Sequence, residues 1–151
     1  MSNNTTVDIE YKEVDDFLSS LDDDDTRKKI ILEGLKGGAK VLQMKTQELF
    51  KTRMGAAAFH QSRYLKNKPF YEGVKMIVDK AYNETIVSIM ADYRMRFFEK
   101  GVPKKRVTKK GYNRGTLDAK HFFRDARDSS DQEIDNAISE GIDTAMRKYL
   151  I

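Results

Sequence analysis

The chain has 151 residues and a formal net charge of +4, from 28 Lys and Arg and 24 Asp and Glu. This length fits one domain with a single sizeable core. The absence of cysteine excludes a disulfide framework, a thiolate metal site and a cysteine nucleophile. No apolar run approaches the ~18 residues of a membrane-spanning helix, so we expect no membrane partner.

Charge is divided between two blocks of opposite sign. Residues 1–25 carry nine acids and one base, a net charge of −8, whereas residues 100–120 carry eight bases and one acid, a net charge of +7. Such blocks are typical of solvated arms and of interaction tails. Three interpretations are open: both blocks are solvated, they contact each other within or between subunits, or the basic block binds nucleic-acid phosphates.

Residues 1–25 are predicted to form an acidic, partly ordered N-terminal arm. Within this arm, Val14, Phe17, Leu18 and Leu21 have the spacing of a short helix over 13–21. The remaining residues, 26–151, are predicted to form a single α+β domain.

The longest predicted helix runs from about Thr26 to Lys51. Its apolar stripe is formed by Ile31, Leu35, Leu42 and Leu49, and it is widened by Leu32, Ala39 and Phe50. Gly37 and Gly38 lie within this pattern, where each costs about 1 kcal/mol relative to alanine. They indicate either a kink or a close approach of another backbone.

A connection over 53–69 precedes a change of period from helical to alternating. Apolar residues alternate over 74–78, over 87–91 and over 93–97, and Asn83-Glu84 marks a turn. This pattern predicts an antiparallel sheet of three to four short strands. A long basic loop follows over 101–120, and loops of this length are often functional.

The final helix is predicted to begin at Ser130. Ser130 and Glu133 have the spacing of a capping box, and one apolar face then continues from Ile134 to Tyr149. The expected architecture is therefore α+β, with a long N-terminal helix and a C-terminal helix packed on a small sheet.

The sequence contains no set of residues that supports catalysis. Its two histidines, His60 and His121, are far apart, and no hydrolase, metalloprotease or dinucleotide-binding motif is present. We therefore expect a protein that is not an enzyme and that holds no metal or cofactor. The tripeptide Asn113-Arg114-Gly115 suits either phosphate contacts or a plain tight turn.

Three short motifs follow one another in the second half of the chain. Their residues are Phe98, Glu99 and Gly101, then Gly111, Asn113, Arg114 and Gly115, then Phe122, Phe123 and Ala126. In this order they resemble the tail-completion or head–tail joining proteins of long-tailed phages and prophages. That family has an aromatic-Glu-x-Gly-Thr turn, a variable loop and a Pro-Phe-x-x-x-Ala element between a small sheet and a final helix. Val102 replaces the usual threonine, and His121 or Phe122 replaces the usual proline.

The resemblance covers residues 26–150 and implies a structural protein of the virion. Such proteins assemble in the bacterial host cytoplasm into a ring, sixfold in the virion, at the neck between head and tail. The implied partners are other copies of the chain, neighbouring neck or tail proteins and, in passing, the phage DNA. The candidate residues for an interface or for DNA contact are Lys104, Lys105, Arg106, Lys109, Lys110 and Arg114.

The alternative prediction is a small nucleic-acid-binding protein. In this case the basic 100–120 loop and a face carrying Arg94 and Arg96 would contact phosphates.

Overall fold

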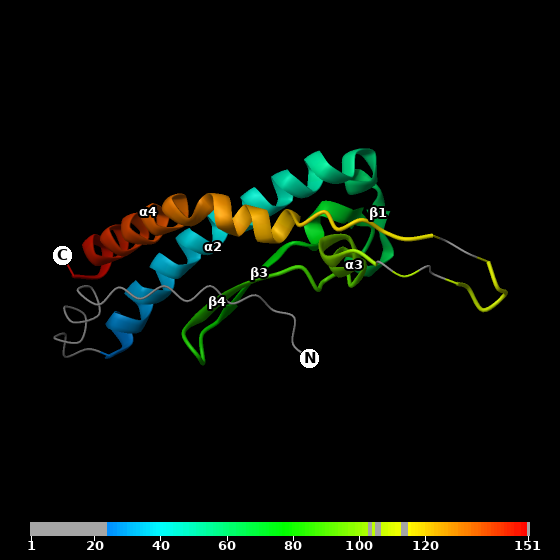
Figure 1. The fold of residues 1–151 in the computed structure, drawn as a ribbon. Helices are drawn as coiled ribbons and strands as arrows, with labels where there is room; N and C mark the ends of the chain where they lie inside the picture. Colours follow the sequence, from blue (N-terminus) through cyan, green and yellow to red (C-terminus); the bar gives the residue numbers. More distant parts are fainter. Residues whose placement is uncertain (1–23, 103, 105–106, 113–114, 151) are drawn as a thin grey trace. The chain divides into compact units, whose positions relative to one another are not determined.

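The computed structural model describes residues 24–102, 104, 107–112 and 115–150. The helices are α2 (Asp24–Met54), α3 (Arg94–Lys100) and α4 (Phe122–Leu150), and the strands are β1 (Gln61–Ser62), β2 (Lys68–Pro69), β3 (Lys75–Asp79) and β4 (Glu84–Ser88) (Figure 1). The predicted α+β class is confirmed, with a long first helix, a long last helix and small antiparallel sheets. Among the described helices, none is long and apolar enough to cross a membrane.

The described residues group into two compact units. One contains 24–42, 76–87 and 130–150, and the other contains those from 43 to 75 and from 88 to 129. The helix predicted over 13–21 lies outside the described residues. The predicted division into an arm over 1–25 and a single domain over 26–151 stays a prediction.

In the first unit, the beginning of α2 packs closely on the end of α4. A Cβ atom added at Gly141 would lie 3.0 Å from the Cα of Gly34, and one added at Gly37 would lie 2.9 Å from the carbonyl oxygen of Ala137. The contacts run from Gly34 with Ile142 to Gly38 with Ile134, so the two segments are antiparallel. Because α2 is continuous from Asp24 to Met54, the glycines mark a close approach of backbones rather than a break.

The buried face of α2 differs from the predicted stripe. Ile31, Leu35, Ala39 and Leu49 are only half-buried, whereas Leu32, Leu42 and Phe50 are buried as expected. Buried positions instead recur at every fourth residue, namely Ile30, Gly34, Gly38, Leu42, Thr46 and Phe50. Two glycines and a threonine occupy this line, which explains why apolar side chains alone did not reveal it.

The predicted strands are partly confirmed. β3 lies within one residue of the predicted strand over 74–78, and β4 begins and ends earlier than the predicted strand over 87–91. Between them, the carboxylate of Asp79 accepts the backbone N–H groups of Ala81 and Tyr82, which shapes the turn. β1 and β2 form a second antiparallel pair within the segment that was predicted to be a connection.

The third predicted strand, over 93–97, is wrong, because these residues belong to the region of helix α3. Alternating apolar residues over such a short stretch also fit one face of a helix. The carboxylate of Asp92 accepts the backbone N–H of Arg94, the first residue of α3, at 3.1 Å. This contact satisfies a donor that would otherwise be unpaired at the start of the helix.

The second unit has an aromatic core. The ring of Phe50 meets the rings of Phe70 and Phe122 edge to face, with centroids 5.0 and 4.8 Å apart, and Phe70 also meets Phe98 at 5.9 Å. Phe50 and Phe122 are fully buried. This core joins segments that are far apart in sequence, and it supports the base of the basic loop.

The predicted start of the last helix is also wrong. α4 begins at Phe122, and Ser130 is a fully buried residue inside it rather than its cap. The actual cap comes from another part of the chain.

Candidate functional site

The basic loop leaves the second unit from a closed base. Val102 and Leu117 pair as an antiparallel bridge, donating backbone N–H groups to each other's carbonyl oxygens at 2.8 and 2.9 Å. The N–H of Lys120 donates to the carbonyl of Phe98 at 2.7 Å. These bonds hold the two ends of the loop side by side.

Both the backbone conformation of Gly101 and the lack of space for a side chain require glycine at this base. Its φ of +73° is unfavourable for residues with a side chain. A Cβ atom here would lie 2.7 Å from the backbone nitrogen of Ala119 and 2.8 Å from the carbonyl oxygen of Leu117. Any larger residue at this position would therefore push the two ends of the loop apart.

Glu99 caps α4 across the loop. Its carboxylate accepts the backbone N–H of Phe123 at 2.8 Å and that of Arg124 at 3.0 Å, and its own carbonyl accepts the N–H of His121 at 3.2 Å. The side chain is buried, and a carboxylate at a helix N-terminus is favoured by the helix dipole. α4 therefore begins at Phe122 because its cap is supplied by α3.

The structure brings together six of the residues that carry the sequence resemblance. Phe98, Glu99 and Gly101 lie on one side of the loop base, and Phe122, Phe123 and Ala126 lie on the other. All of these except Phe98 and Gly101 are buried. Together they join α3 to α4, so the two motifs on either side of the loop are parts of one structural element.

The glycines of the middle motif lie farther along the loop. Gly111 and Gly115 both have a left-handed backbone, with φ of +83° and +71°, and nothing lies within 4 Å of a Cβ atom added at either. Gly111 lies in a turn in which its N–H donates to the carbonyl of Thr108. Asn113 and Arg114 lie outside the described residues, so both interpretations of that tripeptide stay open.

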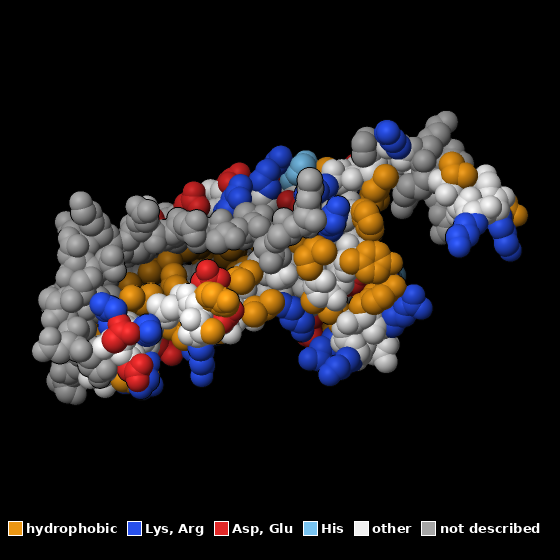
Figure 2. All heavy atoms as spheres, turned by 90° about the horizontal axis from the view of Figure 1, so that it is seen from below, with side chains coloured by type: hydrophobic (Ala, Val, Ile, Leu, Met, Phe, Trp, Pro, Cys, Tyr) orange, Lys and Arg blue, Asp and Glu red, His pale blue; other side chains and the backbone are white. Residues whose placement is uncertain are grey.

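Beyond the base, the described part of the loop is strongly exposed. Lys104, Lys109 and Lys110 are exposed, and so are Val107 and Tyr112, at 66% and 68%. Figure 2 shows basic and hydrophobic side chains together along this loop, on the right of the view. Lys105, Arg106 and Arg114 lie outside the described residues. The loop thus presents cations and apolar groups on one protruding segment.

An ion pair that the sequence did not reveal fixes the end of the loop. One guanidinium nitrogen of Arg53 donates to the carboxylate of Asp125 at 2.6 Å and to the carbonyl of Lys120, also at 2.6 Å. Arg53 and Asp125 belong to different helices, 72 positions apart. No local motif signals such a pair. The hydrogen bond from Arg53 lowers the pKa of Asp125 below its ordinary value.

This lowered pKa predicts a dependence of stability on pH. The Arg53–Asp125 pair stabilises the folded chain above the ordinary carboxyl pKa of about 3.9, and that contribution is lost as the pH falls through the lower folded-state pKa. We expect Asp125→Asn to flatten the pH dependence of the urea midpoint between about pH 5 and pH 2. The control Asp128→Asn removes a more exposed carboxylate on the same helix. An unchanged profile in Asp125→Asn would show that the pair contributes nothing.

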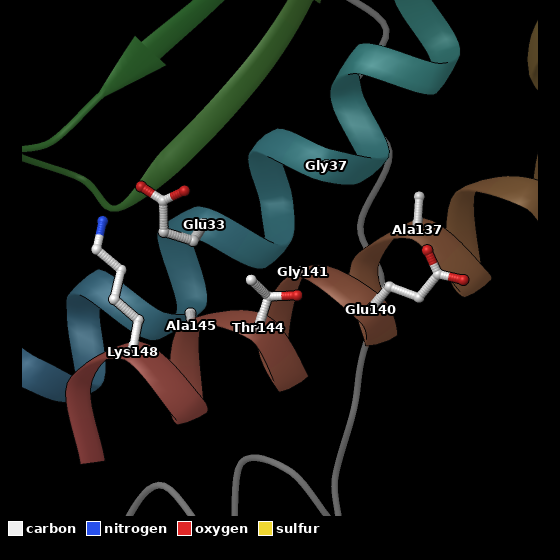
Figure 3. A pocket seen from close by; sticks show the side chains of 8 residues that line it. All are labelled: Glu33, Gly37, Ala137, Glu140, Gly141, Thr144, Ala145 and Lys148. Atoms are coloured by element: carbon white, nitrogen blue, oxygen red, sulfur yellow. The ribbon is translucent and has the colours of Figure 1, made fainter. Parts of the chain in front are cut away.

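The first unit contains a shallow hollow of about 400 Å³. It is lined by Glu33, Gly37, Ala137, Glu140, Gly141, Thr144, Ala145 and Lys148. Figure 3 shows small residues at its floor, with Glu33 from α2 and Glu140 and Lys148 from α4 around them. This hollow lies where the two helices pack closely on each other. Within the described part of the chain, no group of His, Asp and Glu side chains is placed to hold a metal ion.

Comparison of the chain with protein-family models, curated proteins and solved structures gives no significant match.

Proposed function

We propose that this chain is a non-enzymatic structural subunit of a phage or prophage virion. In this proposal it is a head–tail connector or tail-completion subunit that assembles into a ring at the neck. The observation that carries the proposal is the loop base, where the residues of two separate motifs form one structural element that is mostly buried. Support also comes from the order of these motifs along the chain.

A ring needs two different, complementary patches on each subunit. The loop provides one candidate, because Val107 and Tyr112 expose apolar surface beside lysines on a protruding segment. Exposed apolar groups of this kind are typical of a surface that becomes buried in a partner. The acidic block over 1–25, with its net charge of −8, provides opposite charge on the same chain.

The first test is the mass of the protein by light scattering over a concentration series, at low salt and at 0.5 M salt. We expect ring-sized species that grow with protein concentration and dissociate in salt, because salt screens contacts between exposed charges. A monomer under all conditions would exclude spontaneous ring formation by this chain.

Reversing the charge of the loop is expected to block assembly without unfolding the subunit. The variant replaces Lys104, Lys109 and Lys110 with glutamate, since all three side chains are exposed. The control makes the same change at the exposed residues Lys40, Lys68 and Lys80. We expect light scattering to show loss of ring-sized species in the loop variant alone, with unchanged circular dichroism. Normal assembly of the loop variant would show that the loop is not the interface.

The second candidate function is nucleic-acid binding by the loop, favoured by its exposed lysines and by the exposed ring of Tyr112. A protein that makes ~5 phosphate contacts should give a slope of log K against log salt of about −4 to −5. A ring subunit with an incidental basic loop should bind DNA weakly. Arg94 is a poor candidate for phosphate contact, because it forms an ion pair with Asp92 at 2.6 Å.

A further inference from the structure

Three exposed aromatic side chains form a connected surface on the second unit. Tyr64, Tyr93 and Phe97 are 41%, 48% and 44% exposed. Tyr93 meets Tyr64 at 5.2 Å and Phe97 at 6.1 Å between ring centroids, edge to face in both cases. We call these three residues, together with Arg63 and Arg94, the aromatic platform. Tyr, Phe and Arg are the residue types that are enriched where proteins bind each other.

An ion pair with a buried carboxylate holds Arg94 in place within the platform. Asp92 is fully buried, and its carboxylate accepts two hydrogen bonds from the guanidinium of Arg94, at 2.9 and 2.6 Å, and one from the hydroxyl of Ser62. The same guanidinium lies 5.3 Å from the ring centroid of Tyr64. Burial raises the pKa of Asp92, but the hydrogen bonds from Arg94 and Ser62 outweigh it and keep the pKa below its ordinary value. A platform fixed in this way loses little conformational entropy when it binds.

The polar edge of the platform favours an anion. Arg63 donates to the hydroxyl of Tyr64 at 3.0 Å, and the hydroxyls of Tyr64 and Tyr93 lie 3.4 Å apart. The hydrogen bond with Tyr93 and, to a smaller extent, that with Arg63 lower the pKa of the Tyr64 phenol. On α3 the exposed charged residues beside Phe97 are Arg96 and Lys100, both basic. The acidic Asp92 and Glu99 are buried and hydrogen-bonded.

The geometry favours an acidic peptide over a nucleic acid. Bases bind aromatic residues by stacking on an open ring face. The ring of Tyr64 already has the guanidinium of Arg63 at 5.0 Å and that of Arg94 at 5.3 Å from its centroid. Carboxylates, in contrast, can accept from the arginine and phenol donors at the edge while apolar side chains lie against the rings.

We propose that the aromatic platform binds the acidic N-terminal segment of a second copy of this chain, residues 8–23. That segment contains seven acidic residues and one lysine, a net charge of −6, together with Phe17, Leu18 and Leu21 as apolar anchors. It therefore combines the two chemistries that the platform offers. The proposal rests on the proposed function in that the second copy is the neighbouring ring subunit.

The test measures binding of a fluorescently labelled peptide of residues 8–23 by anisotropy. The receptor is the full-length chain with the acids of its own segment replaced by amides, so that this segment does not compete. The receptor substitutions are D8N, E10Q, E13Q, D15N, D16N, D22N and D23N. In this background, Tyr93→Ala with Phe97→Ala removes the platform. Phe59→Ala with Tyr82→Ala is the control, because it removes two other exposed aromatic residues.

We expect the platform variant to weaken peptide binding about tenfold or more, and the control to leave it unchanged. A peptide with Phe17 and Leu18 replaced by alanine should also bind more weakly. The proposal is overturned if the peptide does not bind the receptor with the unaltered platform. It is also overturned if the peptide binds the platform variant with the same affinity. Labelled oligothymidylate that binds the platform more tightly than the peptide would also overturn it, in favour of a nucleic acid.

This assay does not require a ring. Failure of peptide binding would leave the light-scattering result for the ring unaffected. Conversely, a chain that forms no ring at working concentrations can still bind the peptide.

Discussion

Replacing Phe50 with alanine is expected to lower the free energy of unfolding by about 3–5 kcal/mol, the usual effect of removing a fully buried aromatic ring. Phe50 has no exposed surface, and its ring contacts both Phe70 and Phe122 edge to face. The substitution would leave a cavity in the core that supports the loop base. Urea unfolding followed by circular dichroism and by tyrosine fluorescence measures the effect, since the chain has no tryptophan.

The matched control is Phe59→Ala. Phe59 is 56% exposed and contacts the ring of Tyr71 at 5.6 Å. Its loss should cost less than about 1 kcal/mol, because little apolar surface is returned to water. Equal effects of the two substitutions would show that Phe50 is not in a well-packed core.

Replacing Glu99 with alanine is expected to lower the free energy of unfolding by about 2–3 kcal/mol, through loss of a cap and of two hydrogen bonds to its carboxylate, one of them buried. The backbone N–H groups of Phe123 and Arg124 would lose their acceptor. Amide hydrogen exchange should therefore accelerate at these two residues more than in the middle of α4. Glu99→Gln should have an intermediate effect, because its amide oxygen still accepts.

Glu133→Ala is the control for this prediction. Glu133 is exposed inside α4, at the position that the sequence pattern assigned to a capping box. Its replacement should change stability by less than about 0.5 kcal/mol, as is usual for surface positions. A larger effect for Glu133 than for Glu99 would place the functional start of the helix at Ser130.

The sequence predicted the α+β class and the two long helices because long periodic segments carry a strong signal. It predicted the buried face of α2 only in part, since Gly34, Gly38 and Thr46 occupy buried positions without adding apolar character. Glycine at a helix contact is informative only when the partner helix is known. The alternative of a close backbone approach is nevertheless the one that the structure supports at Gly37, whereas Gly38 makes room for the side chains of Ile134 and Ile138.

The wrong predictions of a strand over 93–97 and of a helix start at Ser130 have a common physical cause. Both helices start at hydrogen bonds made by acidic side chains whose role depends on the fold. Asp92 lies two residues before Arg94 in an apparently alternating segment, and Glu99 reaches α4 from across a long loop. The local capping pattern at Ser130 was therefore a stronger signal in sequence than the actual cap.

The sequence singled out residues that the structure places in the candidate site, but it did not predict how they are arranged. The motifs singled out Phe98, Glu99 and Gly101 together with Phe122 and Ala126, and the structure places them at one loop base. The Arg53–Asp125 pair and the aromatic platform were missed, because each depends on segments that meet only after folding. The basic residues of the loop were identifiable from charge alone.

Because of the bridge between Val102 and Leu117, the length of the loop should have little effect on the stability of the folded chain. Because the loop is already closed at that bridge, residues inserted between its two ends would leave the cap and the aromatic core untouched. Doubling the length of a flexible loop costs only about 0.6 kcal/mol. The length and charge of the loop can therefore be changed while the framework of α3, α4 and the aromatic core stays the same.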